Sequence, residues 1–312
     1  MKDCKKLFQR DRGFCLALSG VVVLILAIGL FQCYDEVRRA LEIIEQYKNY
    51  SFWNGIDLDA FVSDNYAGVM QIVFFVVLAA QIIKWNILES KRGKEFQRLL
   101  PVKSRSHITY DLICGIVFVW VPMVLFVCGQ SLITNAFRSD ITLRWGSVKE
   151  EMLQSIVVFS LIYCMIVFAR KIANNIPGAL FTVFVIWYTP MAFGMVFEKC
   201  DWLMKFCTFD FGYGKHKTIA VLTALFLTVA VVLLSYVCDE KRDNAGTGVF
   251  SFRIVRYLVI AASFADLGLT FYECFPVYGH LLGFARIALS VLLAGGIAAG
   301  LNYLMKPASY KA

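Results

Sequence analysis

The side chains with the most distinctive chemical pattern lie in a basic stretch between residues 84 and 105. Within it, charged residues recur at the i, i+3, i+4, i+7 spacing of one helical face, and apolar residues fall on the other face. Pro101 ends this helix, because its ring clashes with the preceding turn and favours an extended Leu100. The charged face comprises Lys91, Lys94, Glu95 and Arg98, and the apolar face comprises Phe96, Leu99 and Leu100.

Two interpretations of this stretch follow from its composition. The first is a solvated, basic cytoplasmic loop between two membrane helices, which is the usual case for such a loop. The second is a short amphipathic helix that is held against a soluble protein partner. In the second interpretation the chemistry of the stretch is recognition, with apolar residues seated in a groove and charged residues setting the register.

No catalytic motif accompanies this stretch. The sequence contains no G-x-x-x-x-G-K-[ST] phosphate-binding loop, so the chain is not expected to hydrolyse ATP by that route. It also lacks the G-x-S-x-G, H-E-x-x-H and C-x-x-C patterns, and it has 3 histidines. We therefore predict that the chain is not an enzyme, has no catalytic residue and no metal site, and holds no cofactor of its own.

The composition is typical of a membrane protein. Of the 312 residues, 59% are hydrophobic, and the mean hydropathy is +0.65. Several windows have few charges over about twenty residues, the length that crosses a bilayer as an α-helix. We therefore predict an all-α, polytopic transmembrane helical bundle of about eight spans. Their expected limits are residues 14–32, 68–85, 111–133, 152–169, 178–197, 218–238, 254–272 and 279–304.

The basic residues predict the orientation of these spans. If both termini and the loop between the second and third spans share one side, that side holds twenty of the 31 Lys and Arg residues. Lys and Arg accumulate on the cytoplasmic side of membrane proteins, so both termini are expected in the cytoplasm. Residues 1–13 are expected to form an amphipathic turn on the anionic inner leaflet, and residues 37–47 have helical periodicity.

Two charged residues are expected inside the membrane. Asp266 and Arg286 lie ten residues before and after Pro276, so they should reach a similar depth in the last hairpin. Each charge is costly alone in hydrocarbon and much less costly when paired. We favour an ion pair that locks this hairpin over a relay for protons or substrate.

The ten cysteines lie mostly within apolar spans, where they act as small buried hydrophobic residues. Cys200 and Cys207 share one loop that is predicted to be non-cytoplasmic, and a disulfide between them is one possibility. The aromatic and charged loop around them, residues 198–217, is interpreted either as an interfacial loop or as a re-entrant helix.

The run from Glu89 to Arg105 resembles the coupling helix of type-2 ABC transporter permeases. In that family an acidic residue, a glycine, a leucine-rich helix and then Leu-Pro-Val-x-x-Arg follow the second span. A second stretch, Lys241–Phe250, resembles the charged turn after the sixth span in the Gram-positive bacterial subgroup. The residues that match in the first stretch are Glu89, Gly93, Leu99, Leu100, Pro101, Val102 and Arg105.

The resemblance implies an architecture and a set of partners. Residues 1–238 would form a six-span permease core with its coupling helix at about 88–101, and residues 239–312 would add a cytoplasmic turn and a two-span hairpin. The hairpin departs from the family, in which many members have six spans. Implied partners are two ABC ATPase subunits that carry ATP and Mg, a second permease chain (identical or homologous) and membrane lipids, with no nucleic acid. The residues implied to contact the ATPase are Glu89, Gly93, Phe96, Arg98, Leu99, Leu100, Pro101 and Arg105.

Our expectation is therefore the membrane subunit of an ABC exporter in a bacterial plasma membrane. Spans two and five would line the pathway between two such chains, and their apolar and aromatic character suits a hydrophobic, amphipathic or peptide-like cargo. The alternative is a membrane sensor or immunity protein that binds an external ligand and a cytoplasmic partner without pumping. An intramembrane enzyme is a third hypothesis, which would require catalytic polar groups to meet inside the bundle.

Overall fold

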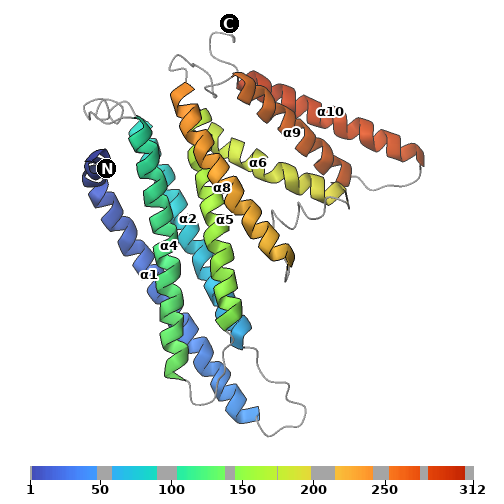
Figure 1. The fold of residues 1–312 in the computed structure, drawn as a ribbon. Helices are drawn as coiled ribbons and strands as arrows, with labels where there is room; N and C mark the ends of the chain where they lie inside the picture. Colours follow the sequence, from blue (N-terminus) through green and yellow to red (C-terminus); the bar gives the residue numbers. More distant parts are fainter. Residues whose placement is uncertain are drawn as a thin grey trace. The chain divides into compact units, whose positions relative to one another are not determined.

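The computed structural model describes residues 2–47, 58–89, 104–137, 145–173, 175–197, 215–241, 253–274 and 280–305. Within these ranges the chain forms a series of long α-helices (Figure 1). They are α1 (Lys2–Tyr47), α2 (Leu58–Glu89), α4 (Ser104–Ala136), α5 (Trp145–Ile172), α6 (Ile176–Val196), α8 (Lys215–Lys241), α9 (Arg253–Cys274) and α10 (His280–Leu304).

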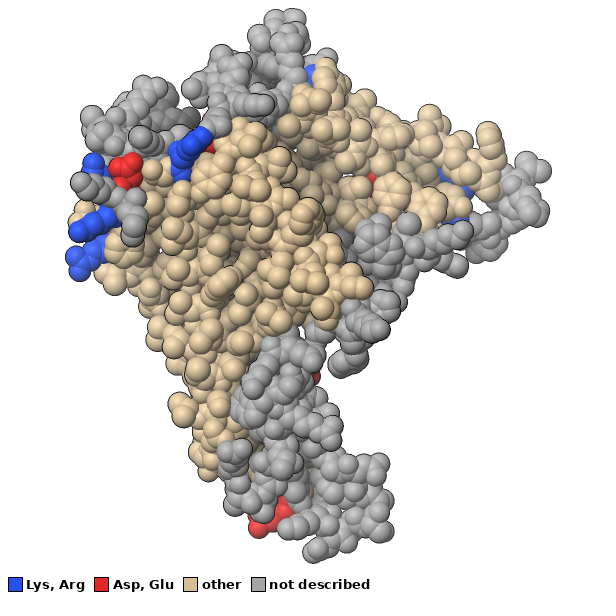
Figure 2. Space-filling view, in the orientation of Figure 1, with Lys and Arg blue, Asp and Glu red and all other residues tan. Residues whose placement is uncertain are grey.

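Among the described residues, 8 helices are long and apolar enough to cross a membrane. This finding confirms the predicted all-α bundle of membrane-spanning helices. Large apolar side chains are exposed along these helices, with exposed fractions of 64% for Phe75 and 73% for Leu132. Apolar surface of this extent is unfavourable in water and suits contact with lipid. Figure 2 shows charged side chains together near the start of α1. The surface next to them is broad and shows mainly uncharged side chains.

α1 is longer than the sequence analysis predicted. The predicted span 14–32 and the periodic segment 37–47 belong to one continuous helix of 46 residues, Lys2–Tyr47. No proline or glycine lies between these two segments, so nothing in the sequence ends the helix there. The polar extension also carries i,i+4 ion pairs, such as Arg39 Nη2 with Asp35 Oδ2 at 2.7 Å.

The chain forms two compact units, unit 1 (residues 1–163) and unit 2 (residues 164–312), and α5 contributes its first part to one and its last part to the other. In unit 1, α1, α2 and α4 pack against one another. In unit 2, α9 packs on both α6 and α10. The division that the family resemblance implies, after residue 238, stays a prediction.

The first part of α5 packs in unit 1 through aromatic side chains. The rings of Phe159 and Phe74 on α2 are stacked, with centroids 4.4 Å apart. On α4, Trp120 Nε1 donates a hydrogen bond of 2.8 Å to Ser160 Oγ. Tyr163, which is fully buried, lies directly against α4. These contacts explain why the bulky aromatic residues of α5 lie inward.

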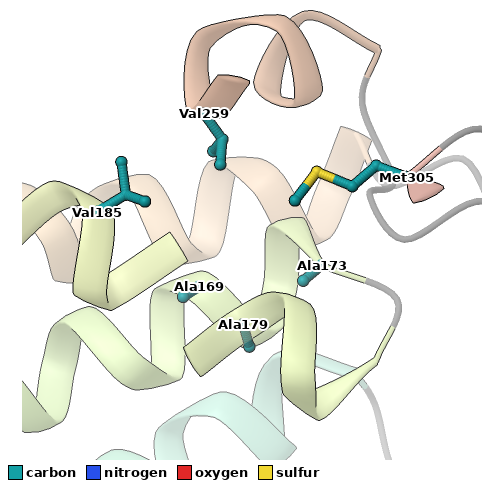
Figure 3. Packing of buried hydrophobic residues seen from close by; sticks show 6 residues of the cluster. All are labelled: Ala169, Ala173, Ala179, Val185, Val259 and Met305. Atoms are coloured by element: carbon teal, nitrogen blue, oxygen red, sulfur yellow. The ribbon is translucent and has the colours of Figure 1, made fainter. Parts of the chain in front are cut away.

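The core of unit 2 is built from small side chains (Figure 3). Alanines on α5 and α6 pack in one buried cluster with Val259 of α9 and with Met305, which follows α10. Small residues allow helix backbones to approach closely, which favours packing in the absence of water. α6 begins at the N-cap Asn175, whose Oδ1 accepts a hydrogen bond of 2.8 Å from the Gly178 backbone N–H. The buried cluster comprises Ala169, Ala173, Ala179, Val185, Val259 and Met305.

Candidate functional site

The start of α1, the end of α2 and the start of α4 meet at one end of unit 1. Ser106 Oγ, on the first turn of α4, donates a hydrogen bond of 3.2 Å to Asp3 Oδ2 near the start of α1. α2 ends at Glu89 and α4 begins at Ser104. The predicted coupling stretch therefore connects two helices that are both held at this end. Residues 90–103 themselves lie outside the described residues.

Four charged side chains form a buried group at this end, which we call the Lys84 cluster: Arg10, Asp11, Lys84 and Asp111. Lys84 Nζ lies 3.0 Å from Asp11 Oδ2 and 3.2 Å from Asp111 Oδ1. Arg10 binds the Asp11 carboxylate with two nitrogens, Nε at 2.6 Å and Nη2 at 3.0 Å. Only 7% of the Lys84 side chain is exposed. The cluster thus joins three helices through charges that are removed from water.

Neutral side chains of α2 and α4 complete the surroundings of Lys84 and Asp111. Gln81 Nε2 donates to Asp111 Oδ1 and Trp85 Nε1 donates to Asp111 Oδ2, each at 3.2 Å. The ring of Tyr110 lies 4.8 Å from Lys84 Nζ, within the range of a cation–π interaction. Both Asp111 oxygens are therefore hydrogen-bonded, as buried charges require.

The α5 helix is attached to the same position of α4. The hydroxyl of Tyr163 donates a hydrogen bond of 2.8 Å to the backbone carbonyl oxygen of Asp111. Asp111 thus receives donors from two helices, α2 at its side chain and α5 at its backbone. A movement of the end of α2 relative to α4 must therefore break the buried contacts that Gln81, Lys84 and Trp85 make with the Asp111 carboxylate.

The Lys84 cluster holds two positive and two negative side chains, so its formal charges balance. Each carboxylate faces at least one cation at hydrogen-bond distance, and Asp111 also accepts from neutral donors. Such an arrangement is suited to fixing helix ends in one geometry. We interpret the Lys84 cluster as a set of contacts that makes the ends of α1, α2 and α4 move together.

The four residues of the Lys84 cluster are not brought together by any pattern in the sequence. The basic stretch was described as starting at Lys84, and the second span was expected to end at residue 85; α2 instead continues to Glu89 and buries Lys84 on its inner face. The i, i+3, i+4 spacing of Gln81, Lys84 and Trp85 is the signal that could have indicated one polar face at the end of an apolar helix.

The residues predicted to contact an ATPase fall mostly outside the described residues. Glu89 is the last residue of α2, and Arg105 is exposed on the first turn of α4. Residues 198–214, with both cysteines of the possible disulfide, lie outside the described ranges, as do residues 242–250 of the second matching stretch. The ATPase contact, the disulfide and the second matching stretch therefore stay predictions. The coupling residues concerned are Gly93, Phe96, Arg98, Leu99, Leu100 and Pro101, and the cysteines are Cys200 and Cys207.

Asp266 and Arg286 contact different groups in unit 2. Asp266 Oδ2 lies 3.0 Å from Thr189 Oγ1 on α6. Arg286 Nε donates to the backbone carbonyl of Tyr272, and its guanidinium carbon lies 3.9 Å from the centroid of the Tyr272 ring. The structure thus gives each charge its own partner on a neighbouring helix, and the ion pair between them stays a prediction.

Acidic, cysteine and histidine side chains do not gather in groups of three or more anywhere in the described part of the chain, so no metal centre is built from them there. No family model, no curated protein and no solved structure matches the chain.

Proposed function

We propose that the chain is the membrane-spanning subunit of an ABC exporter that takes its energy from a separate ATPase. The observation that carries the proposal is the Lys84 cluster, which ties together α1, α2 and α4 at the end where α2 leads into residues 90–103 and α4 leads out of them. A force applied to this connecting stretch reaches both helices at once. The amphipathic pattern of residues 91–100 supplies a surface to which the force can be applied.

The sequence is consistent with a transporter whose energy comes from ATP hydrolysis by another subunit. It contains no G-x-x-x-x-G-K-[ST] phosphate-binding loop, and 8 of the described helices are long and apolar enough to cross a membrane. In the proposed mechanism, ATPase closure pushes residues 90–103, and the Lys84 cluster passes the displacement to α1 as well as to α2 and α4. The shift then switches the pathway between inward and outward access.

The charge distribution of unit 1 supports a cytoplasmic position for this end. Exposed basic side chains lie beside the Lys84 cluster on α1 and α4. The far end of α1 is instead rich in acidic side chains. An excess of Lys and Arg favours retention of that end in the cytoplasm, where an ATPase would be found. The exposed basic residues are Lys5, Lys6, Arg12 and Arg105, and the acidic residues at the far end are Asp35, Glu36, Glu42 and Glu45.

Co-purification tests the proposal. The chain is co-expressed with candidate ATPases from the same genome, the membranes are solubilised, and proteins that purify with the tagged chain are identified. We expect an ATPase to co-purify with the native chain and to be lost from the double variant Leu99→Asp and Leu100→Asp, because two carboxylates cannot be seated in an apolar groove.

A matched control changes charge at the same end without altering the apolar face. The double variant Lys5→Asp and Lys6→Asp replaces two exposed residues of α1 and should retain the ATPase. Size-exclusion profiles must show that both variants are folded. Failure of the native chain to bind any ATPase, or equal binding by the Leu99/Leu100 variant, would remove the proposal and leave a sensor or immunity protein as the leading alternative.

A further inference from the structure

Asp266 is a buried carboxyl group in the middle of α9. Its exposed fraction is 4%, and α9 is one of the helices long and apolar enough to cross a membrane. Oδ2 contacts Thr189 Oγ1 on α6, while Oδ1 has no hydrogen-bond partner among the described residues. A carboxylate normally accepts several hydrogen bonds when it is buried, so this environment is poor for the ionised form.

The contacts of Thr189 leave room for a proton on Asp266. The Thr189 hydroxyl carries one hydrogen, and it lies 2.8 Å from the backbone carbonyl oxygen of Val185 and 3.0 Å from Asp266 Oδ2. These two acceptors compete for that hydrogen, so Thr189 supplies Asp266 with at most one hydrogen bond. A protonated carboxyl removes the competition, because it can donate to Oγ1 while the hydroxyl donates to Val185.

The neighbouring contact is consistent with the same count. Thr270 Oγ1 donates to the backbone carbonyl of Asp266 at 2.7 Å, so the 3.0 Å contact between Thr270 and Tyr188 is made with the tyrosine hydroxyl as donor. With this assignment, neither the Thr270 nor the Tyr188 hydroxyl has a hydrogen left to donate to Oδ1 of Asp266.

Within the described residues, the helices packed on α9 place no counter-charge at hydrogen-bond distance from Asp266. α6 contains no charged residue in its sequence and presents Thr189 and Tyr188. α10 passes this level of α9 with small residues, since Ala294 lies beside Gly268. The cation of α10, Arg286, is bound to the Tyr272 carbonyl and ring. An isolated carboxylate in hydrocarbon is costly, and protonation removes that cost.

We propose that Asp266 is a proton-binding site, a carboxylic acid that stays neutral between α6 and α9 and is hydrogen-bonded to Thr189. Release of the proton to solvent would leave a buried carboxylate with one hydroxyl donor at Oδ2 and none at Oδ1, so proton binding favours the packed state of α6 on α9. The inference rests on contacts within unit 2 and does not depend on an ATPase partner.

Infrared spectroscopy of the purified full-length chain tests this site. A protonated carboxyl has a C=O stretching band that is separate from the bands of ionised carboxylates. We expect the native chain at neutral pH to show such a band, and the variant Asp266→Asn to lack it. We also expect Asp266→Asn to unfold at nearly the native temperature, because a neutral amide of the same shape replaces a neutral carboxyl and can still hydrogen-bond to Thr189.

The variant Thr189→Val identifies the band without replacing Asp266. Valine keeps the side-chain shape of threonine and removes the hydroxyl that is hydrogen-bonded to Asp266, so the band should persist and move to the higher frequency of a carboxyl with weaker hydrogen bonding. A native spectrum that does not differ from that of Asp266→Asn in the protonated-carboxyl region would overturn the proposal. An unfolding temperature of Asp266→Asn well below that of the native chain would also overturn the proposal, because it would favour an ionised, paired Asp266.

Discussion

Replacement of Lys84 by methionine is expected to destabilise the chain by about 3–5 kcal/mol, the usual cost of removing one partner from a buried ion pair. Methionine fills a similar volume but leaves Asp11 without its α2 partner and Asp111 without a cation at 3.2 Å. Chemical unfolding of the detergent-solubilised protein, followed by tryptophan fluorescence, measures the change.

Two further variants separate charge from packing in this experiment. Lys6→Met replaces an exposed lysine of the same α1 end and should change stability by no more than about 0.5 kcal/mol. Adding Asp111→Asn to Lys84→Met should recover part of the loss, because the carboxylate that Lys84→Met leaves without its cation is then neutral, while Asp11 keeps Arg10. Equal stabilities for the Lys84 and Lys6 variants would mean that the Lys84 cluster does not hold the helix ends.

Replacement of Gly115 by alanine should also be strongly destabilising. A Cβ atom at this position of α4 would lie 1.9 Å from Cζ and 2.0 Å from Cε1 of Tyr163. Because those are ring atoms of a fully buried side chain, either the ring or the backbone of α4 must shift. Overpacking costs about 1–3 kcal/mol and occasionally more, and the approach of 1.9 Å places this variant at the upper end, above the gain of about 1 kcal/mol in helix propensity from glycine to alanine.

The control for this variant is Gly20→Ala on α1, where an added Cβ meets nothing within 4 Å. It should be neutral or slightly stabilising. In a Tyr163→Leu background, Gly115→Ala should cost less than in the native chain, because the aromatic ring that it would strike is gone. The contact would be refuted by a Gly115→Ala variant whose melting temperature matches that of Gly20→Ala.

The sequence predicted the membrane-spanning helices well, because a long apolar run has few alternatives to a helix inside a bilayer. It did not predict that α1 continues to Tyr47, since its polar end has the composition of a loop. Helix continuity there depends on i,i+4 charge pairs and on the absence of a helix breaker, which are weaker signals than hydropathy.

The Lys84 cluster was missed for a different reason. Its carboxylates, Asp11 and Asp111, are separated from Lys84 by 73 and 27 positions in the sequence, and each residue alone looks like an ordinary charge near a membrane surface. Similarly, Asp266 was noticed as an intramembrane charge, but its contact with Thr189 lies 77 positions away on α6. Such contacts depend on the three-dimensional packing of helices, which periodicity does not specify.

Site-specific photocross-linking in intact cells tests most directly whether residues 90–103 contact an ATPase. A photoreactive amino acid is introduced at Phe96, on the predicted apolar face, and separately at Phe75 on α2, whose side chain is 64% exposed on a membrane-spanning helix. We expect position 96 to cross-link to a protein that contains the G-x-x-x-x-G-K-[ST] motif, and position 75 to give no such adduct. Absence of an ATPase adduct at position 96, or equal adducts at both positions, would contradict the proposed coupling.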